Sequence, residues 1–162
     1  MSRSRATDAD AGVWNGKSVA RRFVSPDGFI VLVGRTAHDN DILTVKLAAP
    51  RDFWFHVSGE SGSHIVVRNP EGVERLPRET QRFAAALAAG YSKARRAGRV
   101  AVHAARCADV RKPRGAPAGQ VTLTHFTTVH VSPLRQADET RLERQAAMAY
   151  AELRTQRSTR FS

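Results

Sequence analysis

RDFWFHVSGESGSHIVVR, residues Arg51–Arg68, is the most strongly patterned stretch of the chain. Aromatic and β-branched residues fill Phe53–Val57, and these residue types pack well on a pleated sheet, so they predict a strand. A polar loop of glycine, serine and one acid follows over residues 58–62. The apolar run His64–Arg68 predicts a second strand. We therefore expect two neighbouring strands around a tight turn.

Strand periodicity sorts the side chains of this stretch into two faces, because successive side chains point to opposite sides of a sheet. The face expected to build the sheet core carries Phe53, Phe55 and Val57. If the two strands pair, the other face, together with the loop, gathers the candidates for a binding surface: Trp54, His56, Ser63, His64 and Arg68.

Turn signals and apolar runs place further elements on both sides of this stretch. Upstream, residues 17–24 and 29–33 read as strands joined by the turn sequence SPDG. Thr36 is a candidate N-cap for a helix that continues to about Leu47. Downstream, we expect a helix over residues 77–97, a strand over 100–104, a hairpin over 121–131 and a charged helix over 137–157.

The helix expected over residues 77–97 is strongly amphipathic. A period of 3.6 residues gathers apolar side chains on one face: Phe83, Leu87, Tyr91 and Ala94. The opposite face carries a basic stripe: Arg78, Arg82, Lys93 and Arg96. This stripe is either a solvated face or a binding face. The same periodicity in the helix over residues 36–47 places its core side at Ile42, Val45 and Ala49.

The element order ββαββαβββα is an α+β pattern. We predict a single-domain α+β fold with an antiparallel or mixed sheet, a central amphipathic helix and a C-terminal helix. A chain of 162 residues fits one domain with a sizeable core. We expect residues 1–16 to be a flexible lead-in, residues 17–134 to form the domain, and residues 135–162 to form the C-terminal helix and tail.

The charge of the chain points to a polyanionic partner. Lysine and arginine total 26 against 15 acids, a net charge of +11 with a pI near 11.3. The window 93–114 holds eight basic residues and one acid, so the charge is clustered. A Pro/Gly loop over residues 113–119 adds backbone that can approach phosphates closely. The basic residues chosen as binding candidates are Lys93, Arg95, Arg96, Arg111, Lys112 and Arg114.

Other features bear on the cellular setting. No apolar run reaches the roughly 18 residues that a membrane helix needs. The first residues carry charges without an apolar core behind them, which is unlike a signal peptide. One cysteine, Cys107, cannot form an internal disulfide. We therefore expect a cytoplasmic protein without a membrane partner, and the sequence leaves its oligomeric state open.

Catalysis is the less favoured interpretation of the central stretch. GESGS differs from a nucleophile elbow at Ser63, and that motif leads from a strand into a helix, not into a second strand. His56 and His64 could meet across two paired strands, but two ligands are a poor metal site. We predict no catalytic residue, metal or cofactor and expect a protein that is not an enzyme. A small hydrolase using His56 and His64 remains an alternative.

The same residues carry a family resemblance. DFWFHVSGESGSHIVVR is similar to the D-x-W-F-H…G-S-H motif of the NFACT-R domain, the RNA-binding module of the RqcH and NEMF ribosome quality-control factors. Three further segments resemble the family in the same order: GRTAHDNDILT, AAALAAGYSKAR and VAVHAARCADVRKPRGAPAGQV. Together the four segments cover about residues 29–133.

The resemblance implies an RNA-binding domain that engages tRNA and the large ribosomal subunit in quality control of stalled translation. At 162 residues the chain has no room for the N-terminal NFACT domain or the coiled coil of the long family members, so we expect a stand-alone NFACT-R protein. Trp54, His56 and His64 are suited to contacts with unpaired bases, and the clustered cations to phosphates. The main alternative is a protein-interaction module that docks through the C-terminal helix.

Overall fold

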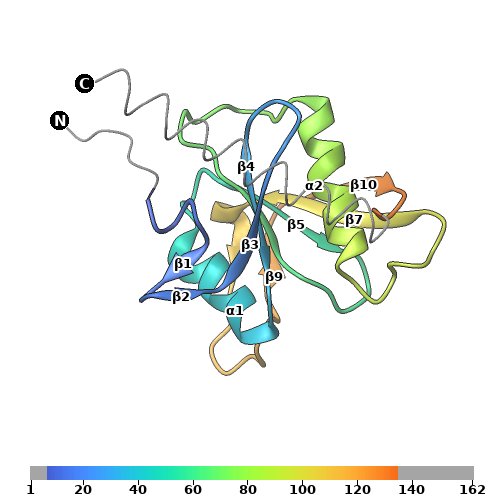
Figure 1. Ribbon diagram of the computed structural model, residues 1–162. Helices are drawn as coiled ribbons and strands as arrows, with labels where there is room; N and C mark the ends of the chain where they lie inside the picture. The colour runs from blue at the N-terminus through green and yellow to red at the C-terminus, as the bar shows by residue number, and fades with distance from the viewer. Residues whose placement is uncertain (1–6, 135–162) are drawn as a thin grey trace, which may run out of the picture.

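Six strands form one sheet in which every neighbouring pair is antiparallel. The computed structural model describes residues 7–134 (Figure 1). From one edge to the other the strands are β10 (Thr127–Val131), β7 (Val100–Arg106), β5 (Phe53–Val57), β6 (Ile65–Val67), β4 (Ile30–Gly34) and β3 (Ala20–Val24). The central stretch identified in the sequence therefore supplies the two middle strands, β5 and β6.

Two small ribbons and two longer helical segments complete the described chain. The ribbons pair β1 (Val13–Trp14) with β2 (Lys17–Ser18), and β8 (Val110–Arg111) with β9 (Thr122–Leu123). A short α-helix, α1 (Ala37–Asp41), continues into a π-helix, η1 (Ile42–Leu47). The longest helix is α2 (Arg78–Gly90), and a single 3₁₀ turn, η2, spans Cys107–Asp109.

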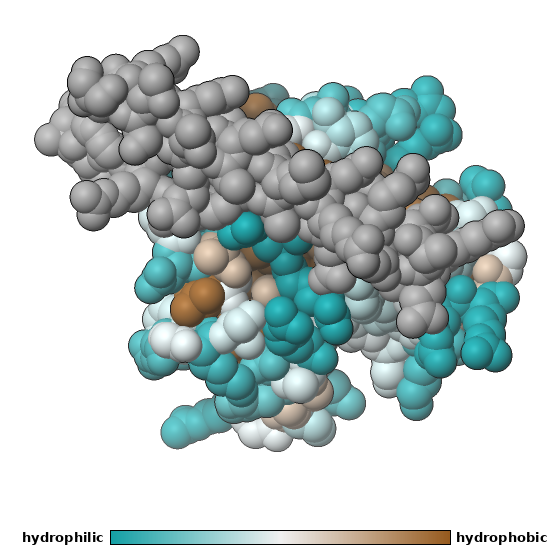
Figure 2. Space-filling model, viewed as in Figure 1, coloured by the Kyte–Doolittle hydropathy of each residue, from teal (hydrophilic) through white to brown (hydrophobic). Residues whose placement is uncertain are grey.

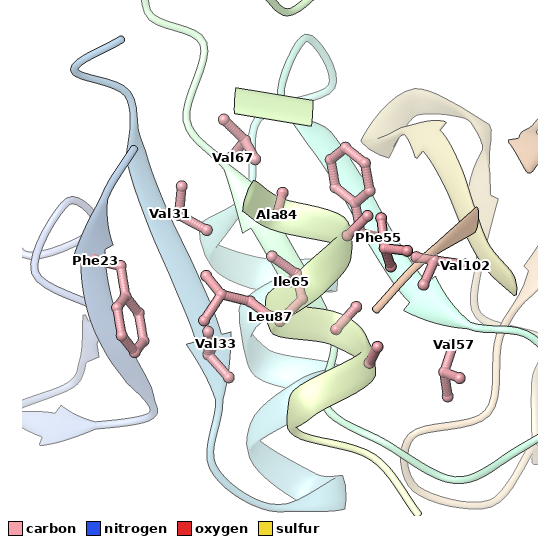
Figure 3. Close-up of a cluster of buried hydrophobic side chains, with 14 of the residues drawn as sticks. Phe23, Val31, Val33, Phe55, Val57, Ile65, Val67, Ala84, Leu87 and Val102 are labelled. Carbon is pink, nitrogen blue, oxygen red and sulfur yellow. The ribbon is translucent and has the colours of Figure 1, made fainter. Parts of the chain in front are cut away.

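The sheet carries a core on each face. On one face α2 packs over the sheet, and Figure 3 shows Ala84 and Leu87 of this helix beside Ile65, Val31 and Phe55. On the other face Trp54 and Val66 pack against Leu43 and Leu47 of η1. The alternation predicted for β5 is confirmed, since Phe55 and Val57 face α2 while Trp54 faces η1. Hydrophilic residues cover most of the described surface visible in Figure 2.

The predicted α+β fold is confirmed, as are the N-terminal hairpin and the strand after the long helix. Arg21 pairs with Val33 in the β3–β4 hairpin. The predicted strand over residues 17–24 is interrupted at Val19, the residue that separates β2 from β3 along the chain. Its side chain is fully buried. Thr36 caps α1 as predicted, because its hydroxyl accepts a hydrogen bond of 3.0 Å from the Asp39 N–H.

Two predicted helix features are wrong. Val45 is 50% exposed and does not face the core; Leu43 and Leu47, four residues apart on η1, form its core-facing side instead. The long helix ends at Gly90, not near residue 97. The backbone that follows the helix pairs instead with the loop after β5: the Ser63 N–H donates to Tyr91 O and the Lys93 N–H donates to Ser61 O, both at 2.9 Å.

The predicted hairpin over residues 121–131 is also wrong. β9 pairs with β8, whereas β10 pairs with β7 at the edge of the main sheet. Between the β8–β9 ribbon and the main sheet the chain passes through Thr124, whose N–H donates to Asp109 O at 2.9 Å. A run of alternating Thr and Val reads as one hairpin because periodicity carries no information about which strand is the partner.

Some predictions concern chain ends. Of the expected lead-in 1–16, residues 7–16 form turns and β1, and Trp14 packs against the η1-side core. The helix expected over 137–157, and with it the interaction module that would dock through it, lies outside the described residues. Within residues 7–134, no helix combines the length and the apolar character needed to cross a membrane.

Candidate nucleic-acid interface

A chain of buried hydrogen bonds links β5, η1, β6 and the Pro/Gly loop. Trp54 Nε1–H donates to Thr44 Oγ1 at 3.3 Å, Thr44 Oγ1 lies 2.7 Å from His64 Nδ1, and His64 Nε2 lies 2.9 Å from Gly119 O. An indole N–H only donates and a carbonyl oxygen only accepts. The Thr44 hydroxyl therefore donates to Nδ1, and the neutral His64 imidazole carries its proton on Nε2.

Burial sets the charge of His64, whose side chain is 1% exposed. The pKa of His64 is lowered to about 4, mainly by desolvation; His56 and Lys112 also lower it, whereas the Gly119 carbonyl and Asp41 oppose the shift. Burial likewise lowers the pKa of His56. At neutral pH both ring nitrogens of His64 are occupied inside the protein, so this ring is not free to act as a general base.

The prediction that Trp54, His56 and His64 share one face is confirmed. The Trp54 and His56 rings stack with centroids 5.8 Å apart, and the His64 ring meets both edge-on at 5.2 and 5.5 Å. The expectation that Trp54 and His64 lie on an accessible surface is wrong, because they are 2% and 1% exposed. Only His56 of the three is partly exposed. η1 and the Pro/Gly loop cover the other two rings.

Arg68 is mostly buried, with a side chain that is 17% exposed, and its guanidinium is engaged by the protein. Its Nη1 donates to Asp52 Oδ2 at 2.7 Å and to Leu47 O at 3.1 Å, and its Nε donates to Asp10 Oδ1 at 3.2 Å. Asp52 also accepts hydrogen bonds from the backbone N–H groups of Ala49 and Asn69, both at 2.8 Å. Arg68 therefore ties the N-terminal segment, η1 and β6 together.

Lys112 has a structural position too. Its Nζ pairs with Asp41 Oδ2 at 3.2 Å and donates to Gln120 O at 3.0 Å and to Pro117 O. The Gly119 N–H donates to the other oxygen of Asp41 at 3.1 Å. Lys112 and Asp41 thus hold the Pro/Gly loop against α1. In this position the Gly119 carbonyl accepts the hydrogen bond from His64. The Lys112 side chain is 22% exposed and its ammonium group is held by these partners, so contact of Lys112 with RNA stays a prediction.

The remaining basic candidates divide between two places. Ser63, Lys93, Arg95 and Arg96 line one cleft of about 880 Å³ beside Gly62 and the C-terminal end of α2. This cleft, called cleft 1 below, also contains Arg35, which the sequence reasoning missed. Arg111 and Arg114 are exposed but lie outside its lining. Arg111 donates to Ala108 O at 2.8 Å.

Cleft 1 is basic, and one of its walls requires close contact between the backbone at Gly62 and Ser92. Its lining residues, all within the described range, include four cations and no carboxylate side chain. Gly62 forms a β-bridge with Ser92, and a Cβ on Gly62 would lie 2.8 Å from Ser92 Cβ. The Asn40 side chain holds this loop from the other side, since Oδ1 accepts from the His64 N–H at 3.1 Å and Nδ2 donates to Gly62 O at 3.4 Å. The buried bond chain and the basic cleft therefore meet at residues 61–64.

Arg35 had a local signal that was overlooked. It directly precedes Thr36, the predicted N-cap of α1, so its backbone position at the start of the helix followed from that prediction. Its Nε donates to Ser18 Oγ at 3.1 Å. What the sequence could not show is that residues 91–96 leave the helix and bring Lys93, Arg95 and Arg96 to the same cleft.

Acidification is expected to destabilise the fold through His64. The unfolded imidazole binds a proton near pH 6.5 and the folded one only near pH 4, so the unfolded state holds more protons between these values. The stability that depends on neutral His64 is therefore fully present above pH 6.5. As the pH drops to 4, the free energy of unfolding falls by about 3 kcal/mol through this group. Urea unfolding measured at several pH values checks this.

The variants His64→Gln and His125→Gln isolate the effect. His125 is a matched control because its side chain is 85% exposed. We expect His64→Gln to flatten the pH dependence between 6.5 and 4, and His125→Gln to leave it unchanged. Equal slopes for the two variants would show that His64 does not control it.

A cleft lined by four cations and no carboxylate, in a chain of net charge +11, is the electrostatic footprint expected of a nucleic-acid-binding domain. A sequence model of the family described as NFACT protein RNA binding domain matches residues 20–125. The chain belongs to this family.

Relatives of known name agree with this assignment. The chain is 37% identical over 115 residues to the Rqc2 homolog RqcH of Bacillus subtilis, covering 71% of this chain and 20% of that protein. It is 31% identical over 72 residues to the ribosome quality control complex subunit NEMF homolog of Drosophila melanogaster, covering 44% of this chain and 7% of that protein. The chain thus spans about a fifth of its bacterial relative.

A solved structure shares the fold. The C-terminal part of the fibronectin/fibrinogen-binding protein from Streptococcus suis superposes with a TM-score of 0.69 at 33% sequence identity. The match covers 76% of this chain and 49% of that one.

Proposed function

We propose that this domain binds tRNA or large-subunit ribosomal RNA through cleft 1 and acts in quality control of stalled translation. Membership of an RNA-binding family supports RNA as the ligand. The names of its relatives, RqcH and the NEMF homolog, support the ribosomal setting and hence action in the cytoplasm. We also propose that the domain binds RNA without catalysing a reaction on it.

The observation that carries the proposal is the composition of cleft 1. Arg35 reaches it from the start of α1, and Lys93, Arg95 and Arg96 reach it from the turn after α2. The lining also includes Ser61 and Ser63, whose hydroxyls can donate hydrogen bonds to phosphate or sugar oxygens. Lys93, Arg95 and Arg96 are exposed, so their charges are available to phosphates at little desolvation cost.

Arg96→Gln is expected to weaken tRNA binding by about three- to tenfold at 0.1 M salt and to lower the slope of log K against log salt by about 1. The reason is that one phosphate contact, and the counterion it releases, is lost. Filter binding to tRNA across a salt series measures both quantities. Lys46→Gln is the matched control, because Lys46 is an exposed cation on η1 outside the lining of cleft 1.

Two results would contradict the proposal: a wild-type affinity that does not respond to salt, or equal losses for Arg96→Gln and Lys46→Gln. Co-sedimentation with purified large ribosomal subunits, with and without bound tRNA, then separates the two RNA ligands. Binding that needs the tRNA assigns tRNA, and binding to the bare subunit assigns ribosomal RNA.

A further inference from the structure

A second cleft, of about 950 Å³, lies at the other end of α2 and is called cleft 2. The first turns of α2, the segment before it, and strands β5, β7 and β10 form its walls. In Figure 1 α2 runs beside β7 and β10, and these elements are in contact. Arg78 and Arg82 of the predicted basic stripe line cleft 2, whereas Lys93 and Arg96 of the same stripe line cleft 1. The most prominent side chains of cleft 2 are Arg75, Arg78, Arg82, Arg99, Arg106 and Phe126.

The charge of cleft 2 is strongly positive. Five arginines line it against two carboxylates, Glu74 and Asp109. The Asp109 carboxylate is already engaged, since Oδ1 accepts from the Thr124 hydroxyl at 3.2 Å and lies 3.4 Å from His125 Nδ1. Across the described part of the chain, no ion pair is formed by four of the arginines: Arg75, Arg78, Arg82 and Arg99. Cleft 2 therefore presents unneutralised guanidinium groups to a ligand.

The fifth arginine is fixed in place. The Arg106 guanidinium lies over the Phe53 ring, 5.1 Å from its centroid, and donates to Glu74 O. This contact holds the segment before α2 against the end of β7. Arginine heads that are positioned by ring contacts and carbonyls can bind phosphate oxygens in a bidentate manner at a reduced entropic cost.

An exposed aromatic ring completes the lining. Phe126 is 50% exposed, one of two large apolar side chains in the described residues with that much exposure. Its ring contacts the His103 ring, with centroids 4.4 Å apart and planes tilted by 47°, and this contact limits its movement. An exposed ring held in this way is a stacking platform for a nucleobase.

We propose that cleft 2 is a second RNA subsite that takes unpaired nucleotides, with phosphates on the arginines and a base stacked on Phe126. This inference rests on the RNA binding proposed above and adds a separate place and a preference for single strands. A duplex keeps its base faces inside the stack and cannot use Phe126. An acidic peptide could use the arginines but would leave the aromatic platform without a role.

The test compares a fluorescein-labelled oligouridylate with an RNA duplex of equal length by fluorescence anisotropy. Phe126→Ala is expected to weaken single-strand binding by about tenfold and duplex binding by less than about twofold. Phe126→Tyr keeps a stacking ring and is expected to retain single-strand affinity within about twofold. Arg82→Gln is expected to weaken single-strand binding by about three- to tenfold, and the matched Lys46→Gln to leave it unchanged.

The outcomes separate this proposal from the previous one. If wild-type protein binds neither RNA, both proposals fail. If Arg96→Gln weakens binding while Phe126→Ala and Arg82→Gln do not, only the second subsite is overturned. If oligoglutamate displaces the oligouridylate at equal charge concentration and Phe126→Ala has no effect, cleft 2 is a surface for acidic peptides and the proposal is wrong. Thermal unfolding of each variant confirms that the comparison is made between folded proteins.

Discussion

Asp52→Asn is expected to lower the free energy of unfolding by about 3–5 kcal/mol, the cost typical of removing one partner of a buried ion pair. The Asp52 side chain is 2% exposed and accepts hydrogen bonds from Arg68 Nη1 and from two backbone N–H groups. The substitution keeps the shape, removes the charge that compensates Arg68, and turns one acceptor into a donor that faces another donor. Chemical denaturation measures the loss.

Asp10→Asn is the matched control, because Asp10 pairs with the same Arg68 through Nε at 3.2 Å. Its side chain is 25% exposed, so water replaces much of what the pair provides. We expect a loss of less than about 1 kcal/mol. Similar losses for the two variants would show that Asp52 is not the group that compensates Arg68.

Gly34→Ala is expected to lower the free energy of unfolding by about 2–4 kcal/mol. A Cβ at this position would lie 1.9 Å from Asn40 Oδ1 and 3.3 Å from Asn40 Cα, so the amide must move away. Asn40 Oδ1 accepts from the buried His64 N–H, and Nδ2 holds Gly62 O. The added methyl group therefore removes hydrogen bonds that keep the loop of cleft 1 in place.

Gly98→Ala serves as the comparison for this prediction. Nothing lies within 4 Å of a Cβ built on Gly98, and its φ is not in the left-handed region. We expect its stability to be unchanged or slightly raised, since alanine restricts the unfolded chain. If Gly34→Ala unfolds at the same denaturant concentration as Gly98→Ala, the Asn40 side chain can leave its position without cost.

The sequence placed two neighbouring strands at β5 and β6, and, on the condition that they pair, it put Trp54, His56 and His64 on one face; the structure shows that pairing. Period-2 alternation fixes which side chains share a face, and a slip by one residue would turn Phe55 and Ile65 away from α2. The charge clustering likewise predicted Lys93, Arg95 and Arg96 as neighbours. These are local properties, and local patterns encode them.

Burial by distant segments could not be predicted in the same way. Trp54 and His64 look like surface residues along their strands, but η1 supplies Thr44 and the Pro/Gly loop supplies Gly119 to cover them. The ion pair of Lys112 with Asp41, far away in the sequence, could not be predicted either. Cleft 2 was missed because its arginines come from the helix stripe (Arg78, Arg82), the basic window (Arg99, Arg106) and the segment before α2 (Arg75), and no sequence pattern shows that the fold brings them together.

The long-range hydrogen bonds of His64, Arg68 and Gly119 also bear on how the chain folds. His64 meets Gly119 across 55 positions of sequence, Arg68 meets Asp10 across 58, and Gly119 meets Asp41 across 78. The β3–β4 hairpin closes a far shorter loop. Closing long loops costs entropy before any contact repays it, and such contacts slow folding. We expect the hairpin to form early in the folding reaction and the region around cleft 1 to be assembled only in its final steps.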